Sequence, residues 1–266
     1  MSHMKHLSAL DIAFLASELA KFKDSKLQQV YQPSKKELIL QFHIRAEGRA
    51  LLKVRVPEAI YLAGSREEAG EVSGFCSILR RKLNGASTTA VSQVEFERII
   101  RFDFTSKNSS YSLFLELFSK GNIILESEGK IVAAAEKQLW ATRKIATGQF
   151  YNLPPAVVNP KTLDEKKLLE LLKSTSKTDL VRFLAMELSL GGLYAEELCL
   201  SSGMDKKAKP STITTPAAKK ILSSLKKLLK SKLSSSVIYK DGKIIDVVPI
   251  ALDYYKNHES KPANSF

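Results

Sequence analysis

The amino-acid sequence predicts an α+β protein in which a β-rich, sandwich-like domain precedes a helical domain. Apolar residues alternate with polar ones over residues 26–56 and again over residues 86–136, as is typical of β-strands. The prolines at 154 and 155 interrupt this pattern, and from Thr162 onward the apolar residues recur at helical spacing. This change of hydrophobic period places a domain boundary near the two prolines.

A helix is expected first, from Ser8 to about Phe22. Ser8 and Asp11 have the spacing of a capping box, in which each residue satisfies a backbone N–H of the other. The apolar side chains that follow share one stripe of the helix, and they are Ile12, Leu15, Ala16 and Leu19.

Residues 26–56 are expected to form β-hairpins. Successive residues of a strand point to opposite sides, so alternating apolar residues share one face. The first such set is Leu38, Leu40 and Phe42, and the second is Leu52, Val54 and Val56.

A short amphipathic helix is expected next, from Phe75 to Leu83, and Gly85 is a natural stop for it. The stretch that follows is β-rich, and one of its strands is apolar on both faces. Two apolar faces favour a sandwich or another sheet covered on both sides. One face carries Tyr111, Leu113, Leu115 and Leu117, and the other carries Phe114 and Phe118.

The helical domain contains two more capping-box sequences, which begin at Thr162 and Ser176. Residues 205–215 are rich in Lys, Ser, Thr and Pro, and they are expected to form a mobile loop. A basic amphipathic helix is expected from Pro216 to Leu233. Its inward residues are Ile221, Leu225, Leu228 and Leu229.

The last predicted element is a β-hairpin over residues 236–247, with Asp241-Gly242 at its turn. We expect this hairpin to rejoin the earlier sheet. The sequence therefore predicts three segments: a β-rich domain over 1–155, a helical domain over 156–210, and a basic helix with a returning hairpin over 211–266.

The charge of the chain is the first indication of function. Its 266 residues include 41 Lys or Arg and 28 Asp or Glu, which gives a formal net charge of +13. This excess favours a polyanionic partner, although composition does not distinguish RNA from DNA or from an anionic membrane. Solubility, or compensation by an acidic segment outside this sequence, is the alternative explanation.

Cysteine usage and hydropathy indicate the cellular compartment of the protein. Cys76 and Cys199 form neither a disulfide framework nor a zinc motif, so each is interpreted as a small buried hydrophobe. No apolar run approaches the roughly 20 residues that a membrane-spanning helix needs. Charged residues break the first apolar stretch, unlike the core of a signal peptide. These observations favour a reducing cytoplasm.

Several short motifs occur along the chain in a fixed order. The motifs are Leu10-Asp11-Ile12-Ala13-Phe14-Leu15, Val30-Tyr31-Gln32-Pro33, Phe75 to Gly85, Gly121-Asn122-Ile123-Ile124-Leu125, Gly148-Gln149-Phe150-Tyr151, Pro154-Pro155 and Leu190 to Leu198. Their order resembles the N-terminal region of the NFACT family, the RqcH/NEMF-like proteins of ribosome-associated quality control, which also carry the older label fibronectin-binding-protein-A-like. The resemblance implies an N-terminal fold similar to formamidopyrimidine-DNA glycosylases and a helix-hairpin-helix near Gly191.

Two features depart from the family pattern. Glu97 stands where the family usually has the Asp of an Asp-Arg pair. Residues 51–62 lack the Ser-Ala-His-Pro segment common in bacterial members, which favours an archaeal-type protein. We also expect truncation before the family's coiled coil, because no heptad repeat precedes Phe266. Met1 to Met4 are interpreted as the remnant of an expression tag.

Glu97 and Arg98 are the first candidate site residues, near the start of a strand expected from Val94 to Phe104. In a regular strand their side chains diverge, and Arg98 would lie at the open end of an apolar face. Its planar guanidinium suits a phosphate or a base there. The alternative is an arginine that snorkels from the core edge and pairs with a distant acid. The resemblance favours the functional interpretation, because the family's Asp-Arg pair is associated with tRNA engagement.

Other candidates are basic residues of the β-rich domain. Trp140 is interpreted as a core residue rather than a base-stacking platform, because no second exposed aromatic is evident. The candidates for nucleic-acid binding are Arg80, Arg81, Arg101, Arg143 and Lys144.

Gly191 and Gly192 lie in a turn between two predicted helices. The N–H groups that open the second helix can bind phosphate without reading sequence, near Tyr194 to Glu196. The alternative is a tight turn that needs glycine for a positive φ angle. Glu196 and Glu197 would weaken the attraction for phosphate.

The basic helix adds Lys226 and Lys230 to the candidate nucleic-acid-binding residues. A solvated lysine face is the simpler interpretation, and an RNA-facing surface would show a steep dependence on salt. The lysines expected to point outward are Lys219, Lys220, Lys226, Lys227 and Lys230.

Signals for an enzyme are poor. The sequence shows no Ser-His-Asp arrangement, P-loop or dinucleotide fingerprint, so no catalytic residue, metal or cofactor is expected. Glycosylases of the similar fold use an N-terminal proline amine, whereas this chain begins Met4-Lys5-His6 after the tag.

The resemblance implies a cytoplasmic factor that engages tRNA, alanyl-tRNA above all, on large ribosomal subunits obstructed by peptidyl-tRNA. There the full protein supports untemplated C-terminal tailing with alanine. Neither a membrane nor DNA is an expected partner. The alternatives are a glycosylase-like DNA-processing protein and, less favoured, an extracellular fibronectin-binding adhesin.

Overall fold

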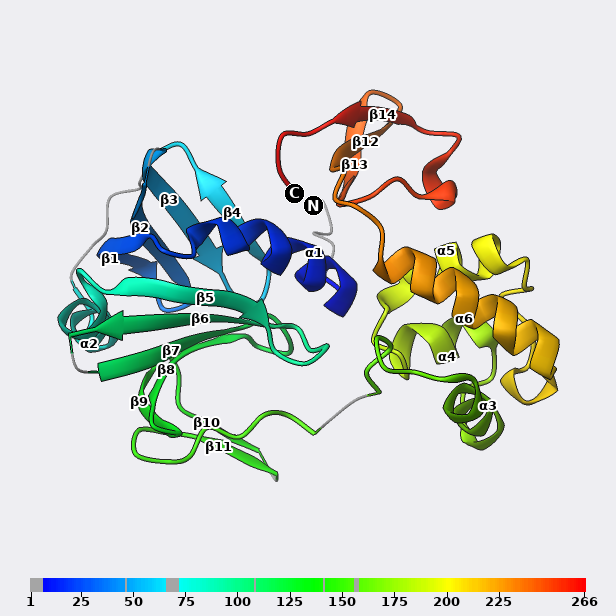
Figure 1. Cartoon of the computed structure of the whole chain (residues 1–266), viewed down its shortest axis with the longest axis horizontal. Helices are drawn as coiled ribbons and strands as arrows, with labels where there is room; N and C mark the ends of the chain where they lie inside the picture. The colour runs from blue at the N-terminus through cyan, green and yellow to red at the C-terminus, as the bar shows by residue number, and fades with distance from the viewer. Residues whose placement is uncertain (1–6, 46, 66–71, 108, 141, 156–157) are drawn as a thin grey trace. The chain divides into compact units, whose positions relative to one another are not determined.

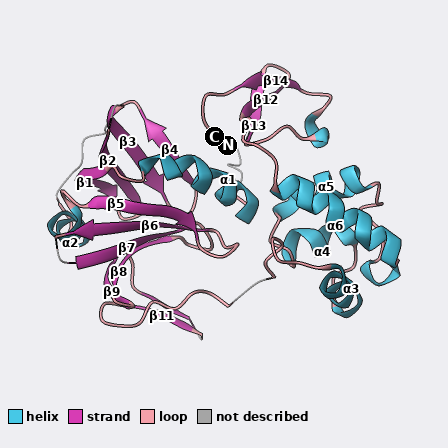
Figure 2. Cartoon of the chain, in the orientation of Figure 1, coloured by secondary structure: helices cyan, strands magenta, loops and turns pink. Residues whose placement is uncertain are grey.

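The computed structural model describes residues 7–45, 47–65, 72–107, 109–140, 142–155 and 158–266 (Figure 1). Met1 to Met4 lie outside these residues. The chain divides into two compact units. The first comprises Met1–Leu7, Ala16–Val94 and Arg98–Ala156, and the second comprises Ser8–Leu15, Glu95–Glu97 and Val157–Phe266. Strands dominate the first unit and helices the second (Figure 2).

A nine-stranded antiparallel sheet forms most of the first unit, in the order β4-β3-β2-β1-β5-β6-β7-β8-β9. The hairpins predicted over residues 26–56 are confirmed, and Leu40 of β2 lies opposite Leu52 of β3. The strands are β1 (Lys26–Ser34), β2 (Glu37–Ile44), β3 (Gly48–Arg55), β4 (Ala59–Ala63), β5 (Ser87–Gln93), β6 (Ile99–Ser106), β7 (Ser109–Glu116), β8 (Asn122–Ser127) and β9 (Lys130–Ala134).

The sheet folds over on itself at the junction of β1 and β5. These strands pair through Lys26 and Ser87, at the start of each strand. Phe42 of β2 and Phe102 of β6 have ring centroids 6.1 Å apart, although β1 and β5 lie between them in the sheet. Three strand spacings in a flat sheet would separate them by roughly 14 Å. The two halves therefore face each other across an aromatic core, which confirms the sandwich-like prediction.

The other face of β6–β8 is covered as well. Phe114 of β7 packs with Ile99, Ile124 and Ile145 in a second cluster of buried residues. Its ring lies 4.1 Å from that of Tyr151, centroid to centroid. Ile145 belongs to a small separate sheet made of β10 (Gln138–Trp140) and β11 (Arg143–Ile145). The expectation of a sheet that is apolar on both faces is confirmed.

Two helices of the N-terminal part begin and end as the sequence predicts. The capping box opens α1 (Ala9–Leu19), and a 3-10 turn continues it to Phe22. The helix α2 (Gly74–Leu83) is capped by Ser73, whose hydroxyl accepts the N–H of Cys76 at 3.0 Å. Gly85 follows with φ +80°, which an L-residue rarely adopts.

The second unit contains α3 (Glu165–Ser174), α4 (Leu180–Met186), α5 (Gly191–Ser202) and α6 (Thr215–Leu229). Two caps differ from the predicted capping boxes at Thr162 and Ser176. Asp164 and Asp179 cap α3 and α4 instead, by accepting the N–H groups of Lys167 and Arg182. None of the described helices is long and apolar enough to cross a membrane.

The segment expected to be a mobile loop is attached to α4. The carbonyls of Ala208 and Lys206 accept the N–H groups of Leu180 and Val181, at 2.8 and 3.1 Å. The first turn of a helix lacks internal partners for its N–H groups, so this segment supplies them. Pro210, in the same segment, is buried.

The last hairpin does not rejoin the nine-stranded sheet, contrary to expectation. Its turn is as predicted, with Asp241 and Gly242 at φ 51° and 72° between β12 (Ser236–Lys240) and β13 (Lys243–Val248). However, β12 also pairs with β14 (Glu259–Pro262), so both of its edges are occupied within a separate three-stranded sheet. Ile238 and Val248 pack in the core of the helices of the second unit.

Candidate nucleic-acid interface

Glu97 and Arg98 lie in the connection between β5 and β6, not in a strand. The expected strand from Val94 is wrong in this respect, because β6 begins at Ile99. The N–H of Val94 donates to the carbonyl of Ile99 at 3.0 Å and closes the end of the hairpin. Glu95 has φ 50°, which lets the chain reverse there. The alternation of faces argued for a regular strand therefore does not apply to Glu97 and Arg98.

Backbone and core contacts position this connection. The carbonyl of Arg98 accepts the N–H of Leu117 at 2.8 Å. Phe96 is 1% exposed and packs in the core of the second unit, with the ammonium of Lys161 5.5 Å from its ring centroid. Glu97 and Arg98 are both half-buried, and neither lacks an interaction partner. The division into compact units falls between these two residues.

Asp11 is a buried carboxylate in the first turn of α1. One of its oxygens accepts the N–H of Ser8 at 2.8 Å, and the other accepts the hydroxyl of Tyr194 at 2.6 Å. Burial and the neighbouring Asp11 carboxylate raise the pKa of Tyr194, so the phenol stays protonated and donates. The sequence indicated the capping role of Asp11, but the bond to Tyr194 spans 183 residues and only the fold reveals it.

Gly191 opens α5 beside this network. Its φ is +73°, and a Cβ placed there would lie 3.1 Å from the Cβ of Ser8. The positive φ favours glycine, and the tight approach to Ser8 adds to that preference, which supports the structural interpretation of the turn. Gly192 is exposed, and the residue before Gly191, Leu190, gives α5 no side-chain cap. The first-turn N–H groups of α5 thus keep the polarity that attracts an anion.

Two acids predicted to oppose an anion near α5 are occupied elsewhere. Glu196 forms an ion pair with Lys206, with N–O distances of 2.8 and 3.0 Å. Glu197 is buried and accepts the N–H of Tyr254 at 2.8 Å. Their opposition to phosphate is therefore weaker than the sequence alone suggests.

The two arginines of α2 have different environments. The Nε of Arg80 donates to the carbonyl of Val30 at 2.7 Å, and its guanidinium lies 5.7 Å from the ring centroid of Tyr31. Arg80 therefore anchors α2 to β1. Arg81 is exposed and has the accessibility that a phosphate contact requires.

Arg143 is not a surface cation, contrary to its selection as a candidate. It is 6% exposed and forms an ion pair with Glu116, which is 1% exposed. Its Nε also donates to the carbonyl of Asn152 at 2.5 Å. A phosphate from solvent cannot compete with this buried carboxylate. Lys144, the next residue of β11, is exposed.

Arg101 lies on β6 and points to partly exposed surface. Its Nε is 3.0 Å from a carboxylate oxygen of Asp103, two residues along the same face of the strand. An exposed pair of this kind contributes little to stability and is screened by salt. Arg101 is accessible, and its charge is partly compensated.

The five lysines selected on the basic helix are all exposed, but α6 ends at Leu229 rather than Leu233, so Lys230 lies just past its end. Lys219 lies 3.8 Å from a carboxylate oxygen of Glu165. Exposure agrees equally with a solvated face and with an RNA-facing surface. In the first unit, α2 and β11 lie well apart (Figure 1), so their basic residues do not form one cluster.

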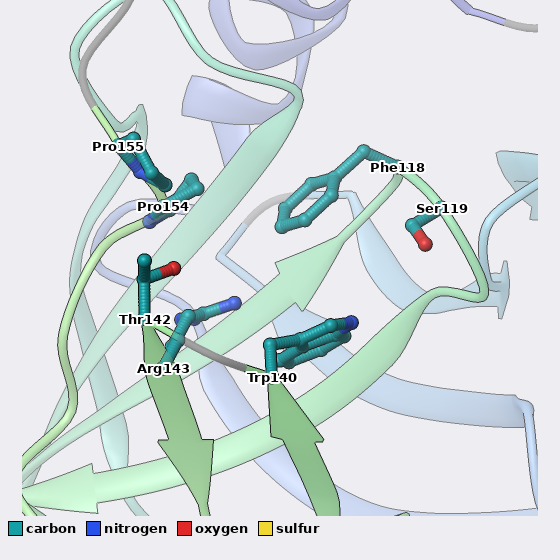
Figure 3. A pocket seen from close by; sticks show the side chains of 7 residues that line it. All are labelled: Phe118, Ser119, Trp140, Thr142, Arg143, Pro154 and Pro155. Carbon is teal, nitrogen blue, oxygen red and sulfur yellow. The ribbon is translucent and has the colours of Figure 1, made fainter.

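Trp140 is exposed rather than part of the core. It is 39% exposed on β10 and lines a cleft with Phe118, Thr142 and Arg143 (Figure 3). Phe150 nearby in the chain is 62% exposed. The strands β10 and β11 are three residues long, too short for a periodic pattern to show which side chains face outward.

Comparisons with known proteins agree with the resemblance noted in the sequence. A relative from Methanocaldococcus jannaschii, the archaeal Rqc2 homolog aRqcH, is 30% identical over 98% of this chain and 41% of its own length. The ribosome quality control complex subunit 2 of Saccharomyces cerevisiae is 31% identical over 56% of this chain and 14% of its own length. This chain thus spans less than half of either relative.

The fold also matches a solved structure. The N-terminal part of the fibronectin/fibrinogen-binding protein from Streptococcus suis superposes with a TM-score of 0.74 at 22% identity, over 94% of this chain and 92% of that one. The family model described as NFACT N-terminal and middle domains matches residues 8–266. Since that match extends over nearly the whole sequence, the chain belongs to the NFACT family.

Proposed function

We propose that this chain is the tRNA-binding part of a ribosome quality-control factor of archaeal type. The observation that carries the proposal is its alignment, over nearly its whole length, with a relative named as an archaeal Rqc2 homolog. A yeast relative is named as a subunit of the ribosome quality control complex. The proposed setting is a large ribosomal subunit obstructed by peptidyl-tRNA, in the cytoplasm.

In this proposal the chain binds and recruits, and the ribosome makes the peptide bond. The full protein brings charged tRNA, alanyl-tRNA in particular, for untemplated extension of the stalled nascent chain. The chain itself then needs no catalytic residue and is not an enzyme. What it needs is an accessible positive surface and a few fixed polar groups that position the RNA backbone.

Several features of the structure support such a role. The exposed lysines of α6, together with Arg81 and Lys144, suit phosphate contacts. The backbone of Arg98 is held by hydrogen bonds at the end of the hairpin, and Phe96, next to Glu97, is buried, so each residue stands on ordered backbone. A preorganised charged group loses less entropy on binding than a flexible one.

A binding comparison tests the proposal directly. Purified chain is titrated with tRNA, with duplex DNA containing a damaged base, and with fibronectin, all at the same salt concentration. Preferential binding of tRNA is expected. Tighter binding of damaged DNA would favour the glycosylase-like alternative, and binding of fibronectin alone would favour the adhesin.

A further inference from the structure

A cleft in the first unit has the composition of a binding site rather than of a packing defect. Its volume is about 210 Å³. The rings of Phe118 and Trp140 lie on one side of it and Pro154 and Pro155 on the other, with the Arg143 side chain extending between them (Figure 3). All of its lining residues belong to the first unit. Four of its seven lining residues carry rigid rings.

Arg143 carries an unsatisfied donor at this cleft. Its Nε bonds to the carbonyl of Asn152, and its Nη2 bonds to Glu116. Its Nη1 is buried and has no hydrogen-bond partner among the described residues. A buried donor without a partner is costly, so an acceptor that enters the cleft and reaches Nη1 would be favoured.

The charge of Arg143 is already balanced. Glu116 is ion-paired with it in the interior and also accepts the hydroxyl of Tyr151 at 3.0 Å. A balanced pair attracts a free anion weakly, so its remaining N–H suits a neutral acceptor, such as a carbonyl or ring nitrogen. The guanidinium carbon lies 5.7 Å from the ring centroid of Trp140 and 6.0 Å from that of Phe118. A planar ring in the cleft would meet both an aromatic face and this donor.

Positive charge lies beside one wall of the cleft. Lys120, which is exposed, directly follows Ser119 of the lining. The ammonium of Lys36 reaches the same loop, where it donates to the carbonyl of Lys120 at 2.5 Å. Lysines beside an aromatic cleft match a phosphate that flanks a base in a nucleic-acid strand.

We propose that this cleft binds one unpaired base of a single-stranded nucleic acid. The base stacks against Trp140, its acceptor edge lies toward Nη1 of Arg143, and a flanking phosphate lies near Lys120 and Lys36. The site is distinct from Glu97 and Arg98, and it does not depend on the proposed engagement of tRNA.

Fluorescence measures occupancy of the cleft directly, because Trp140 is the only tryptophan of the chain. Short single-stranded oligoribonucleotides and oligodeoxyribonucleotides are compared with abasic strands of equal length and charge, and with a proline-rich peptide. Base-containing strands should quench the fluorescence saturably, and abasic strands should not. Comparison of the ribose and deoxyribose strands shows whether the sugar contributes.

Variants separate stacking from general attraction. Trp140→Ala should weaken binding of a labelled oligonucleotide roughly 5- to 100-fold, the usual size of one base–aromatic stack. Phe150→Ala is the matched control, because Phe150 is an exposed ring with Lys130 5.7 Å from its centroid and does not line the cleft. It should bind nearly as the parent does. The tRNA proposal is tested separately, by the tRNA affinity of Arg98→Ala, so one proposal can fail while the other stands.

Three outcomes would overturn the assignment. Equal quenching by abasic strands would show that phosphate alone is bound. Equal losses in Trp140→Ala and Phe150→Ala would show a diffuse surface effect. Quenching by the proline-rich peptide but not by any oligonucleotide would make the cleft a peptide site.

Discussion

Arg98 shows how backbone contacts can fix the position of a single residue. Its carbonyl bonds to Leu117, and the next residue begins β6. A guanidinium on such an anchored residue is a better phosphate or base ligand than one on a mobile loop, because less freedom is lost on binding. The proposal therefore makes its sharpest prediction at this position.

Arg98→Ala should reduce tRNA affinity by about 1–3 kcal/mol, the usual size of one specific nucleic-acid contact, and leave the fold intact. Glu97→Asp should be nearly silent, since it restores the residue usual in the family. Glu97→Gln should cost more if the carboxylate orients an arginine or accepts a bond from RNA. Affinity and thermal stability are measured on the same preparations, with Arg49→Ala at an exposed position of β3 as the charge-matched control. A destabilised Arg98→Ala protein that binds tRNA like the parent would assign Arg98 a structural role only.

Tyr151 and Tyr194 make stability sensitive to alkaline pH. Burial, followed by a neighbouring carboxylate, raises the pKa of both phenols. Above the ordinary tyrosine pKa of about 10, the unfolded chain loses these protons while the folded chain keeps them, so the free energy of unfolding falls as pH rises. Each residue contributes at most about 1.4 kcal/mol per pH unit.

Tyr194→Phe tests this dependence. The variant should be less stable than the parent at neutral pH by about 1–3 kcal/mol, because Asp11 loses a buried donor. The difference should shrink above pH 10, where the parent loses the contribution of Tyr194. Urea unfolding curves at several pH values measure both quantities. A constant difference from neutral pH to pH 11 would contradict the assigned shift.

At the scale of elements, the start of α5 depends on close approach to the start of α1. Gly191 and Ser8 are neighbours in space although they are far apart in sequence. Gly192, the next residue, has open space around its Cβ position and no positive φ. Substitution of Gly192 is therefore a matched control for substitution of Gly191 in the same turn.

Gly191→Ala should destabilise the protein by about 1–2 kcal/mol through the left-handed backbone conformation, with added strain from the contact to Ser8. Gly192→Ala should change stability little, since alanine is well tolerated in a helix. Thermal melts of both variants provide the measurement. Equal effects of the two substitutions would show that the turn is not set by the φ angle of Gly191.

At the scale of the whole molecule, charge governs association with RNA. A net charge of +13 draws polyanions at long range, and each phosphate that the protein neutralises releases counterions. The lysines of α6 are exposed and dispersed, so they suit this unspecific contribution better than base recognition.

The logarithm of tRNA affinity should therefore fall linearly with the logarithm of salt, by roughly 0.7 to 0.9 per neutralised phosphate. Lys226→Ala combined with Lys230→Ala should flatten the slope by about one or two units if α6 contacts RNA. Lys166→Ala combined with Lys173→Ala on α3 removes the same charge from exposed positions of another helix. Identical slopes for the parent and the α6 variant would show that those lysines are merely solvated.

Local sequence determined the elements themselves. Alternation placed the strands around Leu40 and Leu52, the Ser8–Asp11 spacing placed the start of α1, and Asp241-Gly242 placed the last turn. Each of these signals depends on residues a few positions apart. A strand, a helix or a turn fixes the relative positions of such residues. The order of short motifs also indicated the NFACT family, which the match over residues 8–266 confirms.

Only the tertiary structure decided which elements meet and which side chains are buried. The last hairpin pairs with β14 in a separate sheet instead of joining the large sheet, and Arg143 forms an ion pair with Glu116 in the interior. The cleft at Trp140 likewise needs Phe118 and Pro154, which lie on separate segments. Several segments with similar β-propensity could pair with one strand edge, and several acidic side chains could pair with one arginine. The choice among them depends on contacts distant in sequence, and periodicity carries no record of those contacts.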